Sequence, residues 1–80
     1  MDSNTKSPDV AEIHNRFTYH KPSGNQAERY EQLRAEARRL AILITELCPH
    51  SRERSVALTE LQSTIMWANA SIAINESHDR

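Results

Sequence analysis

The stretch QAERYEQLRAEARRLAILITELCPHSRERSVALTELQSTIMWANASIAIN, residues 26–75, decides the fold. It contains two runs in which apolar residues recur every three or four positions, and only Pro49 and His50 separate them. This spacing predicts one apolar stripe along each of two α-helices. The first stripe contains Ala27, Tyr30, Leu33, Ala37, Leu40 or Ala41, Ile44 and Leu47; the second contains Ala57 or Leu58, Leu61, Ile65, Ala68 and Ile72.

Residues that start and stop helices set the limits of the hairpin. Asn25 is expected to cap the first long helix with its side chain, and Ser51 the second. Pro49 ends the first helix because it lacks an N–H and disfavours helical geometry in the residue before it. So short a connection allows only an antiparallel partner. The prediction is two long antiparallel helices, over residues 25–48 and 51–75.

The segment before the hairpin predicts a short helix and a loop. Pro8 suits the first helical position, and Asp9 adds an acid to the first turn. Pro22 and the single glycine, Gly24, then interrupt helical periodicity. The fold class is therefore all-α, with one domain over 1–80 that comprises a disordered tail (1–6), a short helix (7–15), a loop (16–24) and the hairpin.

The length of the chain indicates that a lone hairpin is marginal. A domain this small buries only about 60% of the surface that its unfolded chain exposes. The single cysteine, Cys48, cannot form an internal disulfide and is expected to be a buried small residue. Four apolar residues lie partly off the stripes and leave apolar surface for a protomer interface. They are Val56, Met66, Trp67 and Ile74. We therefore expect a homo-oligomer.

Charge and composition argue against several functions. The net charge is −1 and the pI about 6.4, so no overall positive field favours duplex nucleic acid or a membrane as partner. The second long helix has no cation after Arg54, which argues against a helix-turn-helix DNA binder. The four histidines do not pair at metal-ligand spacing, and the N-terminus lacks a secretion signal. We predict a cytosolic protein, not an enzyme, with no catalytic residues, metal or cofactor.

The loop sequence RFTYHKP, residues 16–22, combines two aromatic rings, an imidazole and two cations next to a proline. Aromatic faces stack nucleobases, and Arg and Lys bind phosphate. Two simpler interpretations remain open. Phe17 and Tyr19 could plug the open end of the hairpin core, and the arginines of the first long helix could form only a solvated face. The candidate ligand-binding residues of the loop are Arg16, Tyr19, His20 and Lys21.

Three segments together resemble a known family. RFTYHKP, QAERYEQLRAEARRLA and ELCPHSRERSVALTELQSTIMWANASIA are similar to phage anti-CBASS sponges, over about residues 16–75. The resemblance implies a homohexamer of helical hairpins, in the cytoplasm of an infected bacterial host, that sequesters cyclic dinucleotides between protomers without cleaving them. It implies that Tyr19 lies against the nucleotide and that Arg34 binds phosphate.

The resemblance also implies alternative ligands. Relatives can bind cyclic trinucleotides at a second site and often carry a basic residue where this chain has Ile74, which argues against that site here unless Arg38, Arg39 or Arg80 compensates. A related hairpin occurs in anti-Thoeris sponges, which bind ADP-ribose-derived cyclic signals. A helical adaptor that packs its apolar surface on another protein is the alternative from a different functional class.

Overall fold

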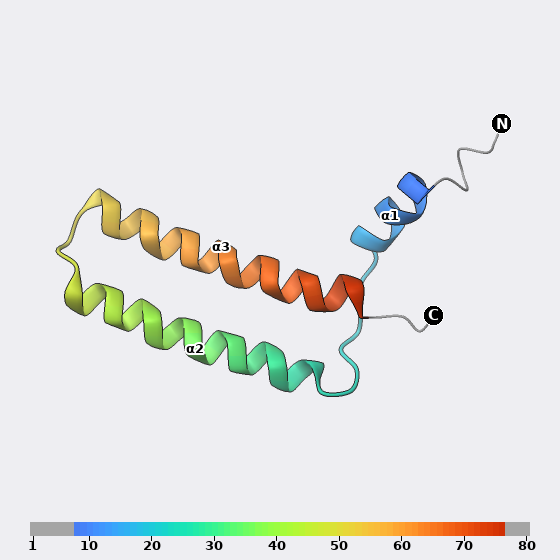
Figure 1. The fold of residues 1–80 in the computed structure, drawn as a ribbon, viewed down its shortest axis with the longest axis horizontal. Coiled ribbons are helices and arrows are strands. Elements are labelled where there is room, and N and C mark those ends of the chain that lie inside the picture. Colours follow the sequence, from blue (N-terminus) through green and yellow to red (C-terminus); the bar gives the residue numbers. More distant parts are fainter. Residues whose placement is uncertain (1–7, 77–80) are drawn as a thin grey trace.

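The hairpin dominates the structure, a computed structural model that describes residues 8–76 (Figure 1). Within that range the chain forms three helices and no strand: α1 (Pro8–Arg16), α2 (Gln26–Leu47) and α3 (Arg52–Asn75). The predicted all-α order of a short helix and an antiparallel hairpin is confirmed. The long helices were expected over 25–48 and 51–75, and the short one over 7–15. The tail expected over 1–6 lies outside the described residues.

The two predicted stripes form the contact between α2 and α3. The central residues of each stripe are half-buried. At the two positions that the sequence left open, Ala41 and Leu58 are half-buried, whereas Leu40 and Ala57 are exposed. Leu47, by contrast, is 73% exposed. It is the last residue of α2, so no further helical turn covers it. The half-buried members of the stripes are Tyr30, Leu33, Ala37, Ala41, Ile44, Leu58, Leu61, Ile65, Ala68 and Ile72.

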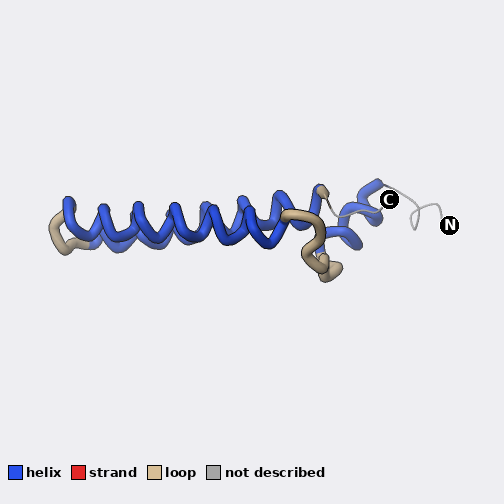
Figure 2. The backbone as a smooth tube through the Cα atoms, turned by 90° about the horizontal axis from the view of Figure 1, so that it is seen from below, coloured by secondary structure: helices blue, strands red, loops and turns tan. Residues whose placement is uncertain are grey.

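The hairpin is a single layer of helices, which Figure 2 shows edge-on. The Cα atoms extend only 13 Å in the thinnest direction, little more than one helix diameter. Most domains bury their apolar faces between two layers. Here, among residues 9–76, no hydrophobic side chain is fully buried and Gln26 is the only buried residue. Both faces of the hairpin and its two edges therefore remain open.

Hydrogen bonds fix the tight turn between α2 and α3. Ser51 Oγ accepts from the backbone N–H of Arg54 at 3.1 Å, so the predicted cap of α3 is confirmed. The Arg54 guanidinium donates to the carbonyls of Thr45 and Cys48, which satisfies acceptors at the negative end of α2. Cys48 is exposed, so its predicted burial is wrong. Cys48 precedes Pro49 and has an extended backbone, so its side chain does not continue the inner face of α2.

The start of α2 differs from its prediction. Asn25 makes no side-chain cap, and its Oδ1 instead accepts from Arg29 Nε at 3.1 Å. The chain enters α2 through a turn in which the Gln26 N–H donates to the Ser23 carbonyl at 3.0 Å. Gly24 has φ +56° in this turn, a conformation that disfavours a side chain. The geometry of the turn therefore takes the place of the expected side-chain cap.

Candidate functional site

The linker between α1 and α2 passes the C-terminal end of α3, where residues far apart in sequence meet (Figure 1). The Asn15 side chain donates from Nδ2 to the Ile74 carbonyl at 3.0 Å. His20 Nε2 lies 2.8 Å from the Asn15 carbonyl oxygen and is positioned to donate to it. These contacts attach the end of α1, and the linker with it, to the last turn of α3.

A second anchor lies at the other end of the linker. Gln26 Oε1 accepts from the Ser23 N–H at 3.0 Å, and Gln26 Nε2 donates to Glu76 Oε1 at 3.3 Å. Arg29 also donates to both carboxylate oxygens of Glu76. Gln26 is only 4% exposed, so its amide is satisfied as a buried polar group must be. No sequence signal singled out Gln26, because its main partner lies 50 residues away.

The ion pair between Arg29 and Glu76 changes the pKa of both groups. Hydrogen bonding to Arg29, and then to Gln26, lowers the pKa of the Glu76 carboxyl. The same hydrogen bond raises the pKa of the Arg29 guanidinium. Glu76 follows the last turn of α3, where the helix dipole disfavours a negative charge. Arg29 offsets that repulsion and links the start of α2 to the end of α3.

The anchored linker presents its aromatic rings to solvent. Phe17 is 84% exposed and Tyr19 is 82% exposed. The interpretation that these rings plug the open end of the hairpin core is therefore wrong for the single chain. The polar anchors explain the difference, because Gln26 and Asn15 occupy the contacts with the end of α3. An exposed ring on an anchored linker is available to stack on a planar ligand.

The other loop candidates differ in their surroundings. Arg16 Nε donates to Glu12 Oε2 at 3.1 Å, one turn earlier in α1. His20 is half-buried and contacts Asn15, whereas Lys21 is exposed. His20 is thus part of the anchor, whereas the side chains of Tyr19 and Lys21 are exposed and available to a ligand.

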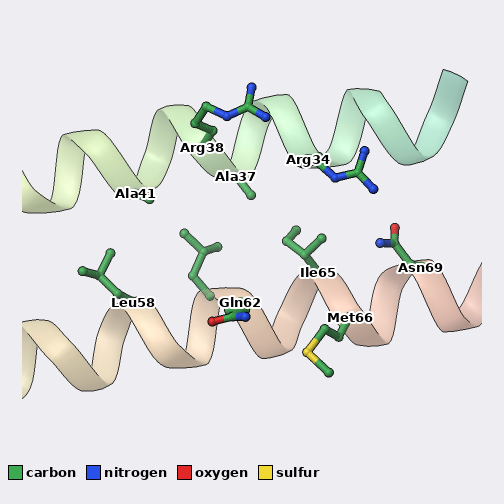
Figure 3. Close-up of a pocket in the computed structure, with 10 residues that line it drawn as sticks. Arg34, Ala37, Arg38, Ala41, Leu58, Gln62, Ile65, Met66 and Asn69 are labelled. Carbon is green, nitrogen blue, oxygen red and sulfur yellow. The ribbon is translucent and has the colours of Figure 1, made fainter.

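Arg34 lies in a groove of about 470 Å³ that runs between α2 and α3 on one face of the hairpin (Figure 3). The small side chains of Ala37 and Ala41 leave space between the helices there. The Arg34 side chain is 51% exposed and donates to Glu31 Oε1 at 2.7 Å. The complete lining is Arg34, Ala37, Arg38, Ala41, Leu58, Leu61, Gln62, Ile65, Met66 and Asn69.

Asn69 adds an unsatisfied acceptor to this groove. Figure 3 shows Arg34 and Asn69 reaching into the space between the helices from opposite sides. Within the described part of the chain, Asn69 Oδ1 is buried and has no hydrogen-bond partner. A buried acceptor without a donor is costly, so a donor from outside the chain would be favoured there. The groove thus combines a cation, a buried acceptor without a donor and an apolar floor.

The candidate residues fall into two separate parts of one chain. The groove contains Arg34 but none of Arg16, Tyr19, His20 and Lys21. Between residues 8 and 76, no group of three or more His, Cys, Asp or Glu side chains is placed to hold a metal ion. In the same range, no helix is long and apolar enough to cross a membrane. These side chains are suited to ring stacking at the linker, through Phe17 and Tyr19, and to anion binding in the groove, through Arg34.

Comparison with known protein families gives a match over most of the chain. A family model described as "Acb2/Tad1, hairpin domain" matches residues 9–73, which include almost all of α1, the linker, α2 and most of α3. No curated protein and no solved structure matches the chain.

Proposed function

Because the chain belongs to the Acb2/Tad1 hairpin-domain family, the anti-CBASS sponge family that its sequence resembles, we propose that it binds and sequesters cyclic dinucleotides without cleaving them. The family match over residues 9–73 is the observation that carries this proposal. Sponges of this family bind their ligands and are not enzymes. Sequestration in the cytoplasm of an infected bacterial host would deprive CBASS effectors of their signal.

The proposed site combines Tyr19 with Arg34. The exposed Tyr19 ring stacks on a base, and the Arg34 guanidinium donates to a phosphate oxygen. Lys21 and Arg16 lie close to Tyr19 in sequence and supply further positive charge near the ligand. His20 holds the linker through Asn15. The exposure of Tyr19 and Lys21, and the contact of His20 with Asn15, support this division of roles.

Assembly supplies what one hairpin lacks. Because Tyr19 and Arg34 belong to separate parts of the chain, a pocket between copies can bring the Tyr19 of one to the Arg34 of another. A cyclic dinucleotide has two bases and two phosphates related by an approximate two-fold axis, and an isologous interface offers each protein group twice. A homohexamer, which the family resemblance implies, would repeat such a pocket. The absence of buried hydrophobic side chains among residues 9–76 supports association.

Isothermal titration calorimetry with a panel of cyclic di- and trinucleotides tests the proposal. We expect saturable binding of at least one cyclic dinucleotide. Chromatography of the ligand released by heating the complex should recover it intact. Absence of binding to every cyclic dinucleotide would refute the proposed ligand class, and recovery of a linear product would refute the non-enzymatic mechanism.

A second candidate is a sponge for ADP-ribose-derived cyclic signals, because the family description joins Tad1 to Acb2. These ligands also offer an adenine ring and phosphates, so they suit the same Tyr19 and Arg34. Including such a signal in the titration panel separates the two ligand classes. A chain that binds neither class would instead fit the helical adaptor.

A further inference from the structure

The groove that contains Arg34 has a second arginine in its lining, Arg38. The two residues are four positions apart on α2, so they lie on the same face of the helix, roughly 6 Å apart along its axis. Figure 3 shows both side chains extending toward the start of α2. The residues that α3 contributes to the lining, among them Gln62 and Asn69, are all uncharged. The charge of the groove therefore comes from the two arginines.

No carboxylate lines this groove, which sets it apart from two other hollows along α2. Glu36 and Glu46 line one of those hollows, and Glu36 also lines the other. The whole chain has a net charge of −1, so the positive charge of the Arg34 groove is a local concentration and not part of a general excess of cations. Two neighbouring guanidinium groups repel each other, and an anion bound between them offsets that repulsion.

Arg38 is unpaired, unlike most arginines that the structure describes. Its side chain has no hydrogen bond or ion pair within residues 8–76, so all of its N–H donors are available to a ligand. Arg52 is also unpaired in that range, but it lies at the start of α3 and outside the groove. The arginines that do donate to a carboxylate or a carbonyl group are Arg16, Arg29, Arg34, Arg39 and Arg54.

We propose that Arg38 is a second phosphate-binding residue, which donates to the same phosphate group as Arg34. The inference rests on the proposed function, because the phosphate belongs to the cyclic dinucleotide that the chain sequesters. A phosphodiester has two non-bridging oxygens, and each accepts a charge-assisted hydrogen bond from one guanidinium. The apolar floor beside the arginines, which includes Ala37, Ala41 and Ile65, strengthens such bonds because it keeps water from one side of them.

The neighbouring Arg39 provides a matched control. It follows Arg38 directly in α2, is 76% exposed and makes only a long ion pair with Glu36, at 3.6 Å. Arg39 does not line the Arg34 groove. Arg38→Gln and Arg39→Gln therefore remove the same charge from adjacent positions of one helix. Glutamine keeps part of the aliphatic stem and has a good helix propensity, so neither change should disturb α2.

Isothermal titration of the full chain measures the effect. The probe is whichever of cyclic di-AMP, cyclic di-GMP and cyclic GMP–AMP the wild type binds most tightly. We expect Arg38→Gln to weaken binding about tenfold or more, and Arg39→Gln by no more than about twofold, because only Arg38 contacts the phosphate. Arg38→Lys should fall between them, because lysine keeps the charge but lacks the planar fork of donors. Light scattering and circular dichroism check that assembly and helices are unchanged.

Equal losses in Arg38→Gln and Arg39→Gln would overturn the inference, because the general field of the helix would then explain both. Wild-type affinity in Arg38→Gln would overturn it as well. Should Arg38→Gln alter the assembly, the pair Arg38→Lys and Arg39→Lys decides, and equal affinities in that pair would refute the contact. With tight binding by the wild type, these results leave the proposed function intact. A wild type that binds no cyclic dinucleotide would overturn both.

Discussion

Replacement of Arg34 by alanine tests the proposed phosphate contact most directly. The structure places this guanidinium at the groove, half exposed, with one N–H used by Glu31. Arginine has five N–H donors, so enough remain for a phosphate. A hydrogen bond to a charged group contributes about 1.5–3 kcal/mol, which corresponds to a loss of affinity of about 10- to 150-fold for Arg34→Ala.

Glu31→Gln is the matched control. It leaves the Arg34 guanidinium in place but removes the carboxylate that holds it at 2.7 Å. An exposed ion pair of this kind contributes at most about 1 kcal/mol. Binding of a phosphate should therefore improve slightly, by at most about fivefold, because the competing anion is gone. The two substitutions thus change affinity in opposite directions although both break the same ion pair.

Isothermal titration with the bound cyclic dinucleotide, at low and high salt, measures both effects. Arg34→Ala should also reduce the dependence of affinity on salt, because one phosphate contact is lost. Light scattering confirms that the assembly is unchanged. Wild-type affinity in Arg34→Ala would show that phosphate binds elsewhere. Equal weakening by Arg34→Ala and Glu31→Gln would show that the ion pair, and not the guanidinium, matters.

Three further predictions concern the linker and the helix ends. Tyr19→Ala should reduce affinity by about 5- to 150-fold in the same titration, from about 1–3 kcal/mol per stacked base, whereas Tyr19→Phe should stay near wild type; equal losses in both would indicate that the hydroxyl, not stacking, binds the ligand. The hydrogen bond with Arg29 lowers the pKa of the Glu76 carboxyl. The stability that this ion pair contributes is therefore present above the ordinary glutamate pKa and is lost as pH falls through the lowered value. Protection of the linker amides, taken relative to their intrinsic exchange rate at each pH, should therefore fall on acidification, and Glu76→Gln should already lack this protection at neutral pH; identical protection in both proteins would contradict the anchor. Ser51→Ala should lower the free energy of unfolding by about 1 kcal/mol in thermal denaturation, and Ser51→Gly by less; no change would mean that the cap does not contribute.

Local signals in the sequence were sufficient for the hairpin. The two stripes, Pro49 and Ser51 gave the helices and the turn, because helical periodicity and capping depend on residues within a few positions of one another. The same reasoning failed at Asn25 and Cys48. At each, the geometry of the adjoining turn, which composition does not reveal, decided where the side chain lies.

The candidate site was predictable as a set of residue types but not as an arrangement. Aromatic and cationic residues in a short loop suggested ligand binding, because stacking and phosphate contacts need those groups. Three features of the arrangement are visible only in the tertiary structure: Tyr19 is exposed, His20 contacts Asn15, and Arg34 lies in a groove that contains none of the linker residues.

The sequence by itself determined the two amphipathic helices and their antiparallel pairing. The tertiary structure decided which apolar residues the pairing leaves exposed, such as Leu40 and Leu43, and how the linker is held by Gln26, Arg29 and Glu76. The physical reason is distance along the chain. Periodic contacts repeat within each helix, whereas Gln26 and Glu76 meet only because two helices of similar length bring their far ends together.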